Sequence, residues 1–231
     1  HSPTSASLID NMYGTNVKYI PISMSYYLTE QDLSVESRNQ AKVAAGLSPT
    51  RPCIVSFGEV HMLKGAKQCI YTAKELHEWG VDFQLVFVGP IEENLKNELT
   101  SRIESYGLSD YISFTGAVSE AIYVQYLKAA DINLQIRQIP FGQVSGALLD
   151  AVSAGMHGVA SENLAKSVEA PPYIHRINDK GSPTLYADKI KSIIDSKQYL
   201  ERPGKGWDEY VNKHSAKSYA HKLISTLFSK F

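Results

Sequence analysis

From about residue 50 onward, short runs of β-branched and aromatic residues alternate with longer segments in which apolar positions have a helical spacing. The short runs end at turn residues such as Gly58, Gly89 and Gly116. Strands that alternate with helices of this length are typical of a parallel sheet in an α/β domain. The pattern predicts strands at 52–57, 83–89, 110–116, 131–136 and 157–161, and helices at 65–79, 92–106, 119–130 and 144–154.

The segment GQVSGALLDAVSAG, residues 142–155, combines a start rich in glycine and serine with an amphipathic helix. Its apolar positions form the stripe that a helix buries against a sheet: Val144, Ala147, Leu148, Ala151 and Val152. Asp150 lies outside that stripe, and Gln143 would share its face about 10 Å away if both were helical. Gly146 would let a ligand approach the backbone, and N–H groups at a helix start attract anions. The pattern indicates a phosphate-binding helix start suited to a sugar nucleotide, although a buried helix with small residues explains it equally well.

The two ends of the chain give weaker patterns. SVESRNQAKVAAGL, residues 34–47, predicts a short amphipathic helix before the first strand, whereas nothing in residues 1–15 predicts a packed element. After residue 182 the spacing predicts a helix at 184–195 and, beyond Pro203 and Gly204, one more at 207–228.

Composition restricts the possible functions. The chain has 231 residues, is 43% hydrophobic and 20% charged, and can bury one large core or at most two small ones. A net charge of −1, without a long basic run, argues against non-specific nucleic-acid binding. The apolar stretches are shorter than the roughly 18 residues of a membrane span, so a cytoplasmic protein is the default expectation. Cys53 and Cys69 are expected to be buried structural thiols, and no Cys/His cluster or Asp-x-Asp motif predicts a metal site.

SGALLDAVSAGMHGVAS resembles the second half of the donor-binding motif of the retaining group 1 glycosyltransferases. That motif has two Glu separated by seven residues, in a context like EGFGLPLLEAMACGVPVV. The resemblance places Asp150 where the family's second Glu binds the ribose hydroxyls, and it places Gly142 where the first Glu contacts the sugar. A variant motif, GETSGALLDALAAG, instead places Gln143 at the first Glu and matches Ser145 and Gly146 directly.

CIVSFGEVHMLKGAKQCIYTAKEL, residues 53–76, resembles the family's opening strand, its GRLVPEKG loop and the following helix. Gly58 and Lys64 match, whereas Glu59 replaces the family's Arg. In the family, the Arg and the Lys both reach the donor diphosphate, so only the role of Lys64 carries over. Because a departing nucleoside diphosphate concentrates negative charge, we expect a substitute cation and choose Arg137, which follows strand 131–136.

The resemblance and the charge argument for Arg137 together predict a site with two catalytic cations and a binding surface for the donor. The catalytic residues would be Lys64 and Arg137. The donor-binding residues would be Gly58, His61, Gln143, Val144, Ser145, Gly146 and Asp150, with no metal and no other cofactor. Ordinary surface charges, and a solvated loop histidine at 61, are the alternatives.

NVKYIPIS, residues 16–23, resembles the connection between the two domains of these enzymes, which have the GT-B fold. The resemblance implies that residues 1–50 are the interdomain connection and lead-in helix, and that residues 51–231 are a Rossmann-like donor-binding domain with helices on both faces and C-terminal helices. The N-terminal acceptor domain would be absent. The expected function is sugar transfer, with retention, from a nucleoside-diphosphate sugar to a glycan or glycoconjugate. The full-length enzyme would be cytoplasmic or peripheral to a membrane, and a catalytically degenerate scaffold or regulatory domain is the alternative.

Overall fold

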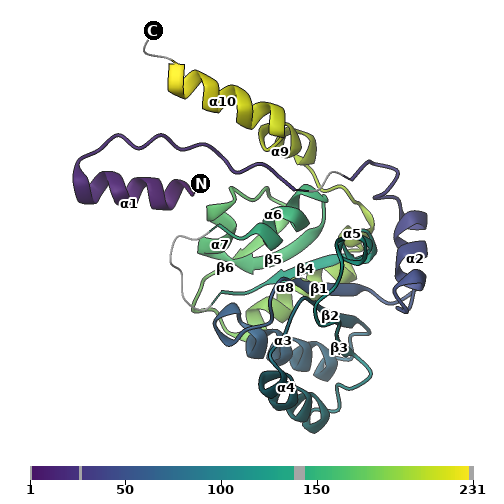
Figure 1. The fold of residues 1–231 in the computed structure, drawn as a ribbon. Helices are drawn as coiled ribbons and strands as arrows, with labels where there is room; N and C mark the ends of the chain where they lie inside the picture. Colours follow the sequence, from purple (N-terminus) through teal and green to yellow (C-terminus); the bar gives the residue numbers. More distant parts are fainter. Residues whose placement is uncertain (1, 26–27, 138–143, 229–231) are drawn as a thin grey trace.

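The computed structural model describes residues 2–25, 28–137 and 144–228, which form a six-stranded sheet covered by helices on both faces (Figure 1). All neighbouring strands are parallel, and their order is β3-β2-β1-β4-β5-β6. The strands are β1 (Cys53–Phe57), β2 (Gln84–Val88), β3 (Ile112–Phe114), β4 (Ile132–Gln135), β5 (His157–Ser161) and β6 (Ile174–Ile177). This confirms the Rossmann-like α/β class. The strand order reverses between β1 and β4, and ligands of such sheets bind outside the carboxyl ends of the strands at this switch point.

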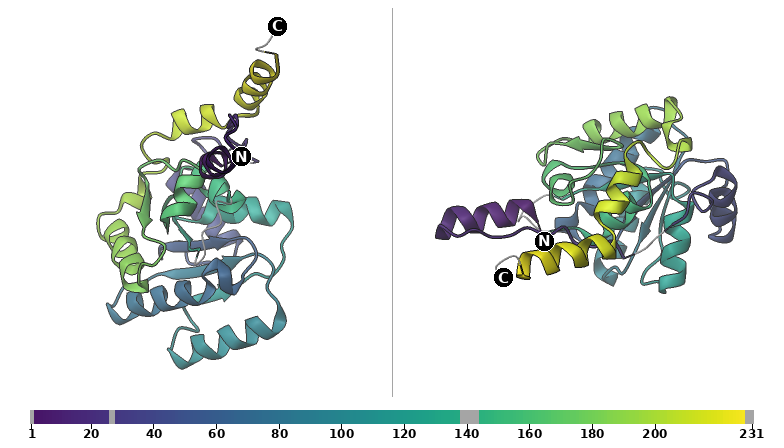
Figure 2. Two further views of the ribbon diagram at one scale, coloured as in Figure 1. Left: turned by 90° about the vertical axis from the view of Figure 1, so that its left-hand side faces the viewer. Right: turned by 90° about the horizontal axis from the view of Figure 1, so that it is seen from above.

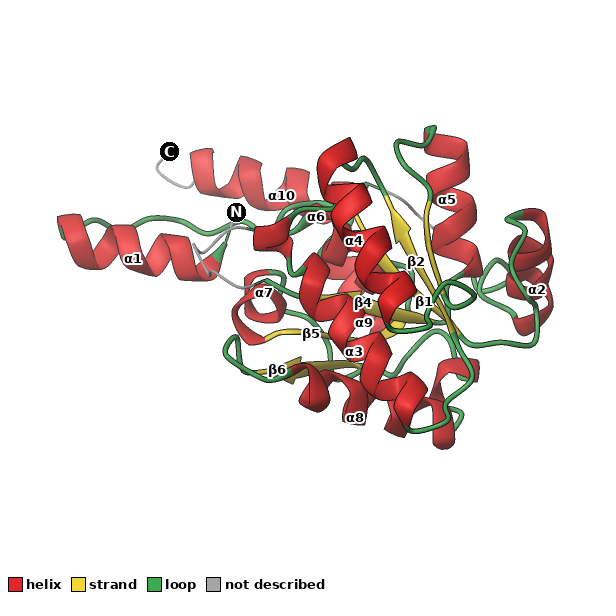
Figure 3. Cartoon of the chain, turned by 90° about the horizontal axis from the view of Figure 1, so that it is seen from below, coloured by secondary structure: helices red, strands yellow, loops and turns green. Residues whose placement is uncertain are grey.

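Alternate residues of each strand enter two separate cores. Val55 and Phe57 of β1 belong to the core that includes α5, α6 and α9, whereas Ile54 belongs to the core that includes α3, α4 and α8. Figure 3 shows α3, α4 and α8 in front of the strands when the chain is seen from below. The helices are α1 (Pro3–Tyr13), α2 (Val35–Ala44), α3 (Ala66–Glu78), α4 (Glu93–Ser105), α5 (Glu120–Ala129), α6 (Gly146–Ser153), α7 (Glu162–Ser167), α8 (Pro183–Asp195), α9 (Trp207–Lys213) and α10 (Ala216–Phe228), with 3-10 turns η1 (Met62–Lys64) and η2 (Gln198–Leu200).

Several short elements differ from the sequence-based expectation. Strand β6 and helix α7 were not predicted, because four and six residues are too few to show a clear period. The helix predicted at 207–228 is two helices, with the break at His214 and Ser215. The break has a local cause: the Ser215 hydroxyl accepts a hydrogen bond from the Ser218 N–H, 3.1 Å away, in the first turn of α10.

Residues 1–15, for which no packed element was predicted, contain a helix that buries none of its residues. Residues 3–13 form α1, which begins after the capping residue Ser2 and ends at Gly14 in the left-handed conformation. None of the described residues in α1 or α10 is buried. Both helices extend beyond the sheet on the same side (Figure 2), and Leu227 and Phe228 are about 60% exposed.

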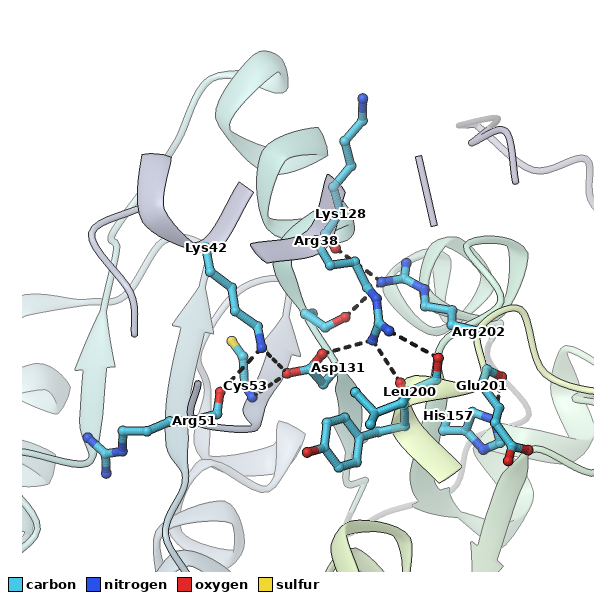
Figure 4. A network of polar contacts seen from close by, with 12 residues as sticks. Arg38, Lys42, Arg51, Cys53, Lys128, Asp131, His157, Leu200, Glu201 and Arg202 are labelled. Carbon is cyan, nitrogen blue, oxygen red and sulfur yellow. Dashed lines mark hydrogen bonds and ion pairs between the residues drawn. The ribbon is translucent and has the colours of Figure 1, made fainter. Parts of the chain in front are cut away.

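A buried polar network joins the amino ends of the central strands to distant parts of the chain (Figure 4). Asp131, just before β4, accepts a hydrogen bond from Arg38 at 2.9 Å and one from the Cys53 N–H at 2.8 Å, and it pairs with Lys42 at 2.5 Å. Arg38 also donates to the Tyr199 carbonyl at 2.7 Å. The network therefore holds α2 and the segment after α8 at the amino ends of β1 and β4, at the opposite end of these strands from the switch point.

Arg202 extends this network by holding the carboxyl ends of two helices. Its guanidinium donates to the carbonyls of Leu127 and Ala130 at the end of α5, and to that of Ala154 at the end of α6. A cation suits this position because helix carboxyl ends carry partial negative charge. Helices α5 and α6 are thereby fixed at the ends remote from the switch point.

Within the described part of the chain, Cys53 and Cys69 are buried, free thiols, as expected, and burial raises the pKa of both. None of the described helices has the length and apolar character needed to cross a lipid bilayer.

Candidate functional site

The loop after β1 touches both the end of β4 and the start of α6. Gly58 has a φ of +95°, and a Cβ placed on it would lie 3.6 Å from the Cβ of Ala147. Gly65 has a φ of +74°, and a Cβ there would lie only 2.6 Å from the Cβ of Ile136. Glycine is therefore required at 65 by its conformation and by close packing. The chain segments that carry Gly58, Lys64, Arg137 and the start of α6 thus converge at the switch point.

Lys64 lies in η1 and forms an ion pair within its own loop. Its ammonium is 2.8 Å from the carboxylate of Glu59, and the side chains are 37% and 57% exposed. This hydrogen bond is the main cause that holds the pKa of Glu59 below its usual value. The residue that replaces the family's Arg therefore partly neutralises the cation that the sequence analysis assigned to the diphosphate.

Arg137 follows β4 and is held there by its backbone. Its N–H donates to the hydroxyl of Ser161 in β5 at 2.7 Å. Burial of the side chain lowers the pKa of its guanidinium, and among the described residues no carboxylate pairs with it. A half-buried cation without a counterion favours binding of an anion.

The start of α6 is capped by Ser145, whose hydroxyl accepts a hydrogen bond from the Leu148 N–H at 3.1 Å. The helix begins at Gly146, two residues later than predicted. Gly146 is exposed, and a Cβ on it would meet no described atom within 4 Å, so packing does not require glycine here. Val144 is partly buried against the core, and Gln143 lies outside the described residues.

Asp150 is 8% exposed, although its position off the apolar stripe predicted an open face. Its carboxylate contacts α5, from which the Tyr123 hydroxyl donates a hydrogen bond of 3.0 Å to Asp150 Oδ2. The other oxygen, Oδ1, is buried without a described hydrogen-bond partner. Burial raises the pKa of Asp150 to about 6, and the bond from Tyr123 opposes this effect in part. Tyr123 could not be singled out from the sequence, because its 14 tyrosines are scattered along the chain.

His61 has a structural role that accounts for its position. Its Nδ1 accepts a hydrogen bond from the Leu63 N–H at 3.2 Å, at the point where η1 begins. The ring also lines a hollow of about 430 Å³, whose wall includes Glu59, Glu92 and Glu98. Three carboxylates make this hollow unfavourable for phosphate. The role of His61 in donor binding stays a prediction. The side of the β1 loop that faces α6 suits an anionic ligand better than this acidic hollow does.

The comparisons with known proteins show the family and the fold. The family model "Glycosyl transferases group 1" matches residues 37–207, which is well over half of the chain. The chain therefore belongs to the group 1 glycosyltransferases. Among curated proteins, no match was found.

Comparison with solved structures shows that this chain has the fold of a domain of the GT-B glycosyltransferases. A glycosyltransferase from Rickettsia africae is 17% identical, with a TM-score of 0.79 over 97% of this chain and 61% of its own. HepE from Anabaena, in complex with UDP and glucose, is 18% identical, with a TM-score of 0.77 over 99% of this chain and 62% of its own. The C-terminal domain of a group 1 family glycosyl transferase from Francisella tularensis is 20% identical, with a TM-score of 0.62, and this chain covers 99% of it.

Proposed function

We propose that this chain is the donor-binding domain of a retaining glycosyltransferase, which binds a nucleoside-diphosphate sugar and supports transfer of its sugar to an acceptor. One observation carries the proposal. Three segments converge at the switch point: the loop after β1, the end of β4 and the start of α6. They carry Lys64 and Arg137 at the carboxyl ends of the strands, where nucleotides bind in this fold.

In the proposed site, the two cations and the start of α6 hold the diphosphate. Bond breaking at the anomeric carbon places a second negative charge on the departing nucleoside diphosphate, and fixed positive charge stabilises that state. Asp150 would accept hydrogen bonds from the ribose hydroxyls, as the resemblance implies. Gly58, Ser145 and Gly146 would present backbone to the ligand, and Gln143 would face the sugar. We propose that the reaction uses neither a metal nor a protein nucleophile, so that the protein acts by positioning and charge stabilisation.

The acceptor would bind mainly to another domain. The chain spans 58 to 62% of the length of three solved chains that it matches, so the activity of a whole enzyme is a proposal for it. Orienting two reactants supplies roughly 7–11 kcal/mol of barrier lowering, and a domain that holds only the donor loses most of it. We expect the 231-residue chain to bind nucleotide and, at most, to hydrolyse the donor slowly.

One observation favours a second function, that of a catalytically degenerate scaffold or regulatory domain. Glu59 occupies the place of the family's Arg and is paired with Lys64 at 2.8 Å. A domain that no longer binds a nucleoside-diphosphate sugar is expected to show such a change, in which an acidic residue replaces the cation that contacts the diphosphate.

Calorimetric titration with a panel of UDP-, GDP-, ADP- and TDP-sugars separates the two functions. We expect saturable binding of one or more of these ligands, loss of binding in Asp150→Ala, and weaker binding in Lys64→Ala and Arg137→Ala. Lys74→Ala is a matched control, because Lys74 pairs with Glu78 on the exposed surface of α3. Absence of binding to every ligand of the panel, with the domain folded, would favour the scaffold.

A further inference from the structure

Tyr123 reaches Asp150 from a fixed position. It lies in α5, whose carboxyl end is held by Arg202, and its ring packs against that of Phe57 with centroids 5.2 Å apart and planes at 63°. Phe57 is the last residue of β1 and directly precedes Gly58. The phenol is thus held against the strand end beside the proposed donor site.

The carboxylate of Asp150 is only half satisfied. Oδ2 accepts the Tyr123 hydrogen bond, whereas Oδ1 is buried and has no described partner. A buried acceptor without a hydrogen-bond donor costs free energy. A donor that is not among the described residues would therefore stabilise this oxygen. A hydroxyl of a bound ligand supplies such a donor.

We propose that Tyr123 is a positioning residue of the donor site, which fixes the short Asp150 side chain so that Oδ1 accepts a hydrogen bond from a ribose hydroxyl of the nucleoside diphosphate. The inference rests on the proposed function. Aspartate is one methylene shorter than the glutamate of the family motif and cannot reach as far. A second anchor on Oδ2 restricts its rotamers before the ligand arrives, which lowers the entropy lost on binding.

The surroundings of Asp150 make the role of Tyr123 measurable. Among the described residues, the titratable groups that interact with this carboxylate are the phenols of Tyr123 in α5 and Tyr210 in α9. Burial is the main cause that raises the pKa of Tyr210, and the Asp150 carboxylate makes the smallest of several added contributions. The Tyr123 hydrogen bond is therefore the described contact that favours the ionised carboxylate over the protonated one.

The test is Tyr123→Phe, which removes the hydroxyl and keeps the ring on Phe57. In the ligand-free protein, a ¹³C carboxyl NMR titration should move the Asp150 midpoint upward from about 6 by about half a unit or more. At pH 8, the affinity for UDP, GDP or ADP, whichever binds the unmodified chain, should fall by roughly tenfold. Tyr126→Phe, the same change one turn along α5, should alter neither quantity. A Tyr123→Phe, Asp150→Glu double variant should recover affinity, because the longer carboxylate reaches the ribose without the anchor.

Two results would overturn the inference while the proposed function stands. One is unchanged affinity in Tyr123→Phe when the unmodified chain binds nucleotide. The other is tighter binding, which would mean that the phenol occupies the place of the ribose. If the unmodified chain binds none of the three diphosphates, the proposed function fails and the ligand role of Tyr123 fails with it. The NMR titration of the ligand-free chain still separates this case, since it reports the hydrogen bond alone.

Discussion

The Lys64 ammonium lies 2.8 Å from the Glu59 carboxylate, so the cation of the β1 loop is paired within its own loop. Arg137, at the end of β4, has no such partner among the described residues. The two cations of the proposed site are therefore not equivalent. A diphosphate would have to compete with Glu59 for Lys64, whereas Arg137 is free to bind it directly.

Glu59→Gln should therefore tighten nucleotide binding. The substitution removes a negative charge beside the proposed diphosphate and frees Lys64, and we expect an affinity gain of about threefold to tenfold at low salt. The gain should shrink at 1 M salt, where the Debye length is about 3 Å. Calorimetry with the best-binding nucleoside diphosphate measures both quantities. Glu78→Gln removes the partner of Lys74 far along α3 and should leave the affinity unchanged. Weaker binding in Glu59→Gln would show that Glu59 itself contacts the ligand.

Asp150→Asn should stabilise the domain in alkaline buffer while it weakens nucleotide binding. Folding raises the pKa of Asp150 from 3.8 to about 6, so the folded state retains a proton that the unfolded state loses. This group's contribution to stability therefore falls as the pH rises from about 4 to above 6. At pH 8 the asparagine should gain on the order of 2–3 kcal/mol in the free energy of unfolding, and little at pH 4 or below. Urea unfolding at the two pH values measures the difference, and an equal gain at both would refute the shifted titration.

A helix or strand could be predicted from the sequence where its apolar residues recur with the spacing that is typical of that element. The five predicted strands are β1 to β5, and the apolar stripe of α6 is buried at Leu148, Ala151 and Val152 as expected. Strand β6 was missed because only Ile174 and Ile177 of its four residues are buried, which is not an alternating pattern. Helix α1 was missed because it buries no residue and therefore has no apolar stripe to detect.

The candidate site could be predicted only where residues share a segment or a motif. The motif resemblance placed Gly58, Lys64 and the start of α6 at one edge of the sheet, and the structure brings their segments together. Contacts across segments could not be predicted. Tyr123 meets Asp150 from a helix 27 residues away, and that distance along the chain carries no sequence signal. The same limit hid the burial of Asp150, whose carboxylate contacts Tyr123 of α5.

Asp131→Asn should unfold the domain more easily without a direct effect on the proposed site. Asp131 is 1% exposed and compensates Arg38 and Lys42, so its loss leaves two buried cations without a carboxylate. Removing one partner of a buried ion pair typically costs about 3–5 kcal/mol. Asp195→Asn, which breaks the exposed pair with Lys191, should cost less than about 1 kcal/mol. Urea unfolding of both variants checks this, and equal effects would contradict the structural role of the network.

Gly146→Ala and Gly58→Ala should separate binding from folding. A Cβ at Gly146 meets no described atom within 4 Å, and alanine is the better helix former, so stability should rise by up to about 1 kcal/mol. The same methyl group would stand between the start of α6 and a diphosphate that approaches its N–H groups, and we expect nucleotide affinity to fall by about tenfold.

Gly58, by contrast, has a φ of +95°, where alanine is strained, so Gly58→Ala should lose both stability and affinity. Thermal unfolding measures the stability of each variant, and calorimetry measures its nucleotide affinity. If Gly146→Ala is more stable and binds nucleotide as the unmodified chain does, the ligand does not approach the start of α6, and the donor site has to be sought on another side of the β1 loop.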